Sequence, residues 1–269
     1  MKHESRFERR HANVSAAIGA MLMLSIYGVG QAQPAGDAGL RIGPPGVGVR
    51  KLPPQSPDAP PPSADPRDLA GIWLANENPI AVGGPPGFGP TPPYTPEAAK
   101  QQQKVAEMIR QGRPPAESAA KCRPSTLFRI AFDVYPGEIV QSADKVVILG
   151  EEGRTRWQIF MNRDHPKEVQ PTFFGDSVGH WEGNTLVVDT IGLNGQIGTL
   201  SPKAHVTSKL RKTDGGKQLE LTVIIEDPVN YTKPYQQTVT ASWRSDVTML
   251  EYQCEENIEG ATEGLLVGQ

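Results

Sequence analysis

The residues best suited to proton or metal chemistry are three histidines, His165, His180 and His205. An imidazole titrates near neutrality and is a common metal ligand. Two of the three have a carboxylate close by in sequence, because Asp164 precedes His165 and Glu182 follows His180 by two positions. In an extended strand His180 and Glu182 share one face. These residues are therefore the first candidates for a functional site.

One hypothesis is a divalent metal site. Two or three of His165, His180 and His205 would gather inside the barrel, with Glu182 or water completing the coordination. The chain contains no HxH, HxxxH or CxxC spacing that would strengthen this hypothesis. The sequence requires no cofactor, and a divalent metal is the one that it allows.

A second hypothesis is acid–base catalysis without a metal. His180 or His165 would move a proton, Glu182 or Asp164 would orient the imidazole, and Arg156 would hold an anionic or carbonyl oxygen. Such a site fits a lyase, an isomerase or a hydrolase acting on a small organic molecule. A third reading is structural, with the histidines fixing loops by hydrogen bonds.

The elements that must position these residues are mainly strands. Alternating or continuous apolar runs separated by turn residues predict strands near 137–141, 145–149, 154–162, 178–182, 185–191, 205–213, 219–226, 236–244 and 248–255, with an earlier strand that begins near 68–73. Gly183-Asn184 and Asp214-Gly215-Gly216 are strong hairpin turns. Thr95 and Pro96 predict the start of a polar surface helix over 96–111. About eight to nine short strands joined mainly by short turns predict an antiparallel closed barrel or a sandwich.

A resemblance adds to this reading. Gly71-Ile72-Trp73 resembles the glycine-x-tryptophan opening of lipocalin-like (calycin) barrels. Longer stretches resemble a widespread family of exported bacterial proteins of no established activity: Glu138 to Gln141, Ser177 to Thr190, Asp227 to Pro234 and Leu250 to Asn257. Members of that family commonly have Gly-Asp where this chain has Gly183-Asn184. The resemblance implies a lipocalin-like barrel and export, and it implies no activity.

A barrel of about eight strands is wide enough to hold one small ligand. Binding of a small molecule in a polar pocket, without reaction, is therefore an alternative to catalysis. Trp157, Trp181, His205 and Tyr231 are the expected ligand contacts. An apolar lining with the histidines outside would favour a carrier of a hydrophobic ligand, and several converging ionisable groups would favour an enzyme. An envelope interaction module would instead have a filled core and an exposed apolar patch.

The first 66 residues predict a targeting segment and a tether. Residues 1–32 combine a basic start, an apolar run over Val14 to Val29 and a small-residue cleavage site after Ala32, which is typical of a signal peptide. The run is too short for a comfortable transmembrane span. Residues 33–66 are rich in Pro and Gly and predict a disordered linker. The barrel is expected over 67–258 and a tail over 259–269, in the periplasm or otherwise exported.

The cysteine content and the charge agree with an exported protein that binds a small molecule. Cys122 and Cys254 are the two cysteines of the chain, and in an oxidising compartment we expect them to form a disulfide. The formal net charge is −3, and Lys and Arg are scattered along the chain. Nothing in this distribution favours nucleic-acid binding.

Overall fold

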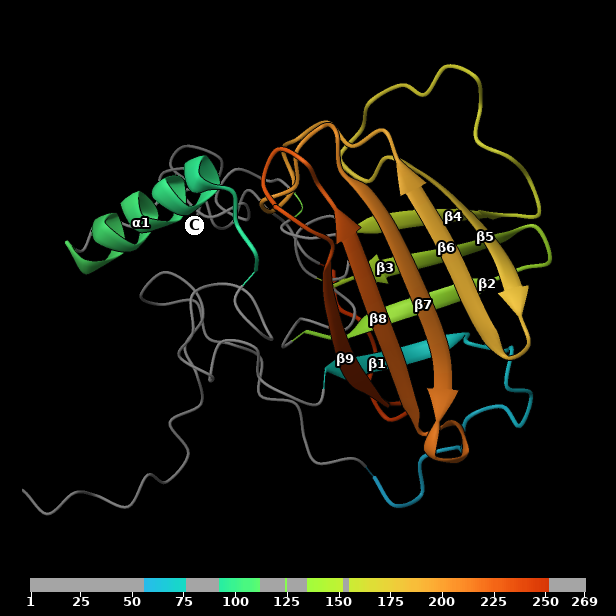
Figure 1. Ribbon diagram of the computed structural model, residues 1–269. Helices are drawn as coiled ribbons and strands as arrows, with labels where there is room; N and C mark the ends of the chain where they lie inside the picture. The colour runs from blue at the N-terminus through green and yellow to red at the C-terminus, as the bar shows by residue number, and fades with distance from the viewer. Residues whose placement is uncertain (1–55, 76–91, 112–123, 125–134, 152–154, 252–269) are drawn as a thin grey trace, which may run out of the picture. The chain divides into compact units, whose positions relative to one another are not determined.

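The computed structural model describes residues 56–75, 92–111, 124, 135–151 and 155–251. Its centre is a closed β-barrel in which neighbours in sequence are neighbours in space and the last strand pairs with the first (Figure 1). The strands are β1 (Gly71–Ala75), β2 (Gly137–Gln141), β3 (Lys145–Gly150), β4 (Arg156–Met161), β5 (Asp176–Glu182), β6 (Thr185–Ile191), β7 (His205–Thr213), β8 (Gln218–Glu226) and β9 (Tyr235–Trp243). The prediction of a mostly β barrel is confirmed.

The hairpins form where turn residues interrupt the apolar patterns. β5 and β6 pair from Glu182↔Thr185 outward, and Gly183 in the turn between them has φ +58°, which glycine adopts without strain. β7 and β8 pair along their whole lengths from Thr213↔Gln218 to His205↔Glu226. Both predicted hairpin turns are therefore confirmed.

The strand that closes the barrel beside β9 differs from the one that the sequence predicted. A strand was expected over 248–255, opposite β9, but residues 248–251 are not in a strand, and 252–255 lie outside the described residues. β9 instead pairs with β1, in the register Trp73↔Trp243. The two indole rings meet edge to face there, 5.3 Å apart, so the short β1 completes the barrel with a large buried contact.

One strand pair is parallel, which the antiparallel prediction missed. β4 and β5 run in the same direction, with Ile159↔Ser177 and Met161↔Gly179 in register. A parallel pair needs a connection that returns along the strand it has just left. Residues 162–175 make that return. This irregular segment, which the hairpin-based reading did not anticipate, carries part of the candidate site.

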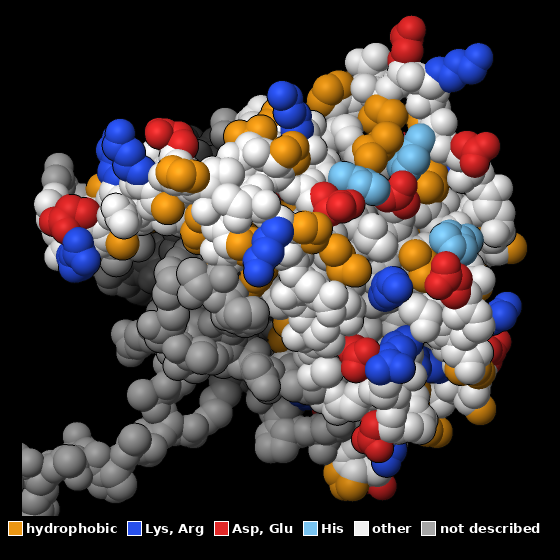
Figure 2. Space-filling model, viewed as in Figure 1, with side chains coloured by type: hydrophobic (Ala, Val, Ile, Leu, Met, Phe, Trp, Pro, Cys, Tyr) orange, Lys and Arg blue, Asp and Glu red, His pale blue; other side chains and the backbone are white. Residues whose placement is uncertain are grey.

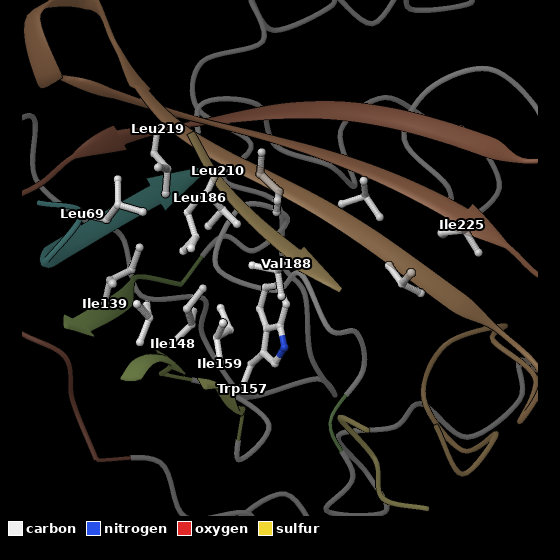
Figure 3. Close-up of a cluster of buried hydrophobic side chains, with 14 of the residues drawn as sticks. Leu69, Ile139, Ile148, Trp157, Ile159, Leu186, Val188, Leu210, Leu219 and Ile225 are labelled. Carbon is white, nitrogen blue, oxygen red and sulfur yellow. The ribbon is translucent and has the colours of Figure 1, made fainter. Parts of the chain in front are cut away.

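Side chains from alternating positions fill the barrel interior. Figure 3 shows the labelled aliphatic residues and Trp157 clustered between the strands. Trp73 and Trp157 are fully buried. At Gly179 the packing is so close that an added Cβ would lie 2.8 Å from Ile159 Cγ2 and 3.0 Å from Met161 Sδ. The described part of the interior is thus a packed apolar core, and functional side chains must be sought on the outer face.

Part of the predicted linker, residues 56–66, contacts the barrel. Residues 56–66 were expected within a disordered linker, yet the carbonyl of Pro60 accepts hydrogen bonds from Trp243 Nε1 (3.0 Å) and Ser245 Oγ (2.7 Å). The carbonyl of Ser63 accepts another from Lys212 Nζ at 2.7 Å. This segment lies against the barrel because its carbonyls satisfy donors at the end of β9 and on β7.

The helix α1 spans Pro96–Arg110 and confirms the prediction. Thr95 caps it, since its Oγ1 accepts a hydrogen bond from the Ala98 amide at 3.3 Å. The same residue ties the helix start to the barrel, because the Thr95 amide donates to the Asn230 carbonyl at 2.8 Å. In the described part of the chain, no helix combines the length and apolar character needed to cross a membrane.

Candidate functional site

A pocket of about 810 Å³ lies on the outer face of β4. Its walls combine aromatic rings with a few polar groups, as in many small-molecule sites. The lining residues are Pro124, Thr155, Arg156, Gln158, Phe160, Thr172, Phe173, Phe174 and Gly175. One wall is therefore β4 itself, and the facing wall is the end of the return segment 162–175.

The period-two geometry of β4 explains its part of the pocket. Trp157, Ile159 and Met161 are buried in the core, so Arg156, Gln158 and Phe160 project from the opposite face. Arg156 is exposed.

Backbone contacts fix the facing wall. The Thr172 amide donates to the Gly192 carbonyl at 3.1 Å, and the Asn194 amide donates to the Thr172 carbonyl at 2.8 Å. Gly175 has φ +65°, and a Cβ there would lie 2.2 Å from the Ile191 carbonyl oxygen. Only glycine fits this close approach, which lets the segment turn directly into β5.

Arg163 connects the pocket to a group of carboxylates and imidazoles. Its guanidinium lies over the Phe160 ring, 4.2 Å from the centroid, and also pairs with the Asp176 carboxylate. Asp176 directly follows the pocket residue Gly175 and is the first residue of β5. The pocket and the charged group therefore share a border.

The charged group alternates acids and histidines across five elements, namely the return segment 162–175, β5, β6, β7 and β8. His165 Nδ1 is 2.7 Å from Asp176 Oδ1, and His165 Nε2 is 3.2 Å from Asp189 Oδ2. His205 Nε2 is hydrogen-bonded to Asp189 Oδ1, and His205 Nδ1 is 3.4 Å from Glu226 Oε2. We call these five residues the His165–His205 cluster. It lies on the outside of the barrel, since Val206 and Ser208 on β7 face inward and His205 faces outward.

Figure 2 shows this face of the molecule, with histidine side chains beside carboxylates. The cluster is partly accessible: the exposed fraction of the side chain is 18% for His165, 41% for Asp189 and 43% for His205. The expectation that histidines gather inside the barrel is therefore wrong. The core has no room for them, and the strand register turns their positions outward.

His180 and Glu182 form a separate surface pair. The two side chains are 3.2 Å apart at the end of β5 and are 58% and 62% exposed. His180 lies four residues along β5 from Asp176, which is about 13 Å at the rise of a strand. The structure thus brings His165 and His205 together and leaves His180 outside their group. An exposed pair of this kind contributes little to stability.

The other predicted site residues have structural surroundings. Asp164 is exposed, and its backbone carbonyl accepts a hydrogen bond from Arg163 Nη1 at 2.8 Å. The carboxylates that contact His165 are those of Asp176 and Asp189, and not that of Asp164. Trp157 is buried and donates from Nε1 to Ser177 Oγ at 2.7 Å. Trp181 packs against the core beneath the Arg67 guanidinium. These positions differ from the ligand and orienting roles expected for them.

Tyr231, also an expected ligand contact, belongs to the core at the end of the barrel from which β9 starts. Burial raises the pKa of its phenol, and the hydroxyl of Thr199 lies 3.3 Å from the phenol oxygen. Its ring packs 5.8 Å from that of Tyr235 and 5.7 Å from that of Tyr94. This aromatic group closes the end of the barrel and lies outside the lining of the pocket over β4.

Sequence reasoning missed Asp176, Asp189 and Glu226. Asp189 and Thr207 are paired across β6 and β7, and His205 and Glu226 are paired across β7 and β8. Both carboxylates therefore face outward beside His205. The available signal was the strand alternation on β6 and β8, but using it required the pairing register.

Comparison with family models and curated proteins identifies no relative of this chain. No family model matches the chain, and no curated protein matches it either. Cys122 and Cys254, expected to form a disulfide, lie outside the described residues.

Proposed function

We propose that this chain is an exported protein that binds a small organic anion in the pocket over β4. Arg156 engages the anionic group, and the rings of Phe160, Phe173 and Phe174 contact an aromatic or apolar body. Gln158 lies between Arg156 and Phe160 on the same face of the strand and supplies a further polar contact.

The observation that carries the proposal is that Arg156, which lines the pocket, has no charged partner among the described residues. Its guanidinium lines the pocket and makes no hydrogen bond or ion pair within the described part of the chain. The other described arginines are all engaged: Arg67, Arg110, Arg163, Arg211 and Arg244 each have a hydrogen-bond or ion-pair partner. A free guanidinium beside aromatic walls matches a carboxylate or phosphate ligand, because its planar donors pair with such oxygens in a bidentate way.

Binding is favoured over acid–base catalysis because the imidazoles either contact carboxylates through both ring nitrogens or lie away from the pocket. A general base needs a ring nitrogen within hydrogen-bond reach of the substrate. In His165 one nitrogen faces Asp176 and the other faces Asp189. His180 lies at the far end of β5, and neither His180 nor Glu182 is among the pocket-lining residues. The packed interior likewise favours the outer pocket over carriage inside the barrel.

Export is the part of the proposal that rests on the sequence. A basic start followed by an apolar run and Gly30-Gln31-Ala32 supports removal of residues 1–32. We expect the mature chain, expressed in a Gram-negative host, to be recovered from the periplasmic fraction with Gln33 as its first residue. N-terminal mass spectrometry checks this, and an intact N-terminus in the cytoplasmic fraction would contradict export.

The binding claim is tested with aryl carboxylates and their uncharged amides. Benzoate, phenylacetate and 3-phenylpropionate serve as probes, and 3-phenylpropanamide is the control of equal shape. We expect at least one carboxylate to bind more tightly than its amide, and Arg156→Gln to weaken that binding roughly 10- to 100-fold, as loss of a charged hydrogen bond does. The matched control is Arg211→Gln, because Arg211 is paired with Glu220 outside the pocket. Equal affinity for acid and amide would overturn the role of Arg156.

A further inference from the structure

The carboxylate of Asp189 lies between two imidazoles. One of its oxygens is 3.2 Å from His165 Nε2, and the other is hydrogen-bonded to His205 Nε2. The three side chains come from three elements, namely the return segment 162–175, β6 and β7. Both histidines present the same ring nitrogen, Nε2, to this central carboxylate.

The opposite nitrogens of both rings face further carboxylates. His165 Nδ1 is 2.7 Å from Asp176 Oδ1, and His205 Nδ1 is 3.4 Å from Glu226 Oε2. Metal-binding histidines characteristically donate their second ring N–H to a carboxylate, which fixes the tautomer and the orientation of the ring. His165 has this hydrogen bond to Asp176, and His205 has the carboxylate of Glu226 within ion-pair distance of its Nδ1. A purely structural brace would not need the two rings to point the same nitrogen at a common carboxylate.

We propose that Asp189 and the Nε2 atoms of His165 and His205 form a binding site for one divalent transition-metal ion, with zinc as the best match. Imidazole and carboxylate are ordinary zinc ligands, and two histidines with one acid leave a fourth position open to solvent. Asp176 and Glu226 hold the two imidazoles from behind. The site is distinct from the pocket over β4 and does not depend on the proposed anion binding.

The separation of the donor atoms supports this assignment. Metal–ligand distances of about 2.0–2.2 Å in a tetrahedral site place neighbouring ligand atoms roughly 3.3 Å apart. His165 Nε2 and Asp189 Oδ2 are already 3.2 Å apart. His205 lies closer to the carboxylate than that and must move back to admit an ion.

As they stand, no three His, Cys, Asp or Glu side chains of the described residues surround a common ion position. The movement required of His205 is open to it because its side chain is 43% exposed on the outer face of the barrel. The backbones of β6 and β7 are held by their antiparallel pairing, so the movement is assigned to the His205 side chain.

Charge also favours a cation. With neutral imidazoles, the carboxylates of Asp176, Asp189 and Glu226 carry three negative charges, and Arg163 returns one positive charge through its pair with Asp176. The remainder of two negative charges matches a divalent ion. Without a metal, the same balance is reached only when both imidazoles are protonated, and that metal-free brace is the competing explanation.

The test is metal binding by the tag-free full chain, purified and then dialysed against a chelator. Zinc is titrated by calorimetry, and cobalt(II) is used as a spectroscopic probe of tetrahedral coordination. We expect one ion per chain, at least a 100-fold loss of affinity in Asp189→Asn and in His205→Ala, and a roughly 10- to 100-fold loss in Glu226→Gln. His180→Ala is the matched control, since His180 is exposed on the same barrel and paired with Glu182.

The outcomes separate the two explanations. Each variant is compared at a temperature where its circular dichroism matches that of the unchanged chain, and His205→Ala decides the question if Asp189→Asn does not fold. No zinc binding by the folded chain at micromolar concentration would overturn the proposal in favour of the brace. Undiminished binding by folded His205→Ala, or loss of binding in His180→Ala, would overturn it as well.

Discussion

The guanidinium of Arg163 lies 4.2 Å from the ring centroid of Phe160. Phe160 lines the pocket, and Arg163 pairs with Asp176 of the His165–His205 cluster. This stacked pair is therefore the contact between the two candidate sites. It exists because β4 and β5 are parallel, so that the connecting segment must return past the outer face of β4.

The buried hydrogen bond of Trp157 should stabilise the barrel measurably. Trp157→Phe keeps an aromatic ring in the core but removes the bond from Nε1 to Ser177 Oγ. We expect the free energy of unfolding to fall by about 1–3 kcal/mol, because the Ser177–Thr190 hydroxyl pair loses a buried donor. Urea denaturation measures this change. Trp181→Phe, at a partly exposed ring, is the control and should cost less; an equal cost would contradict the assignment.

The close packing around Gly179 predicts that adding a methyl group to the core is destabilising. Gly179→Ala should destabilise the barrel by about 1–3 kcal/mol, since the new methyl group would lie 2.8 Å from Ile159 Cγ2 and 3.2 Å from Leu186 Cδ1. Adding Ile159→Ala removes Cγ2, the methyl group with which the new side chain would clash. The double variant should therefore be more stable than the sum of the two single changes indicates, as a thermodynamic cycle from denaturation curves will show. Simple additivity would mean that the clash is relieved elsewhere.

Asp227 should make stability depend on pH. Burial alone would raise the pKa of its carboxyl, but hydrogen bonds from the Ser201 hydroxyl and amide, Asn230 and the Val229 amide outweigh it and hold the pKa below its ordinary value of 3.8. A folded-state pKa below the unfolded one stabilises the fold above the unfolded value, and this stability is lost as pH falls through the folded one.

The corresponding experiment compares the chain with Asp227→Asn by denaturation at several pH values. The unchanged chain should be the more stable at neutral pH, and its advantage should shrink once the pH falls below about 4. Asp164→Asn, at an exposed residue of the return segment, serves as the control. An advantage that stays constant down to pH 2 would show that the carboxylate charge at Asp227 does not contribute.

The segment 56–66 should add to the stability of the barrel. A chain that begins at residue 67 lacks the carbonyls of Pro60 and Ser63, which accept hydrogen bonds from Trp243, Ser245 and Lys212. We expect it to be about 1–3 kcal/mol less stable than a chain that begins at residue 56. Thermal and urea unfolding of the two chains decide the matter. Equal stability of the two chains would show that residues 56–66 do not stabilise the barrel and act only as a linker.

The sequence was sufficient for the barrel because its strands carry local signals. Gly183 and Gly215 mark turns, and the apolar runs between turn residues indicated where β2 to β9 lie. The sequence did not predict that β4 and β5 pair in parallel or that β9 pairs with β1. The direction and the partner of a strand depend on contacts between distant segments. The short β1 carries little pattern beyond Gly71-Ile72-Trp73.

The candidate site was harder to predict for the same reason. His165 and His205 were recognised as individual residues, but their carboxylate partners Asp176, Asp189 and Glu226 become neighbours only through the registers of β5 to β8. His180 and Glu182 looked stronger because they share a strand face, a local pattern that also describes an ordinary surface pair. Tertiary pairing decided which histidines meet.

The location of a bound organic anion tests the central claim most directly. Amide chemical shifts of the isotope-labelled chain are followed by NMR while the tightest-binding of the three aryl carboxylates is added. The account predicts saturable shifts confined to β4 and to residues 172–175, absent in Arg156→Gln. Shifts centred on inward-facing residues such as Val223 and Ile225, or no saturable shift with any of the carboxylates, would contradict it.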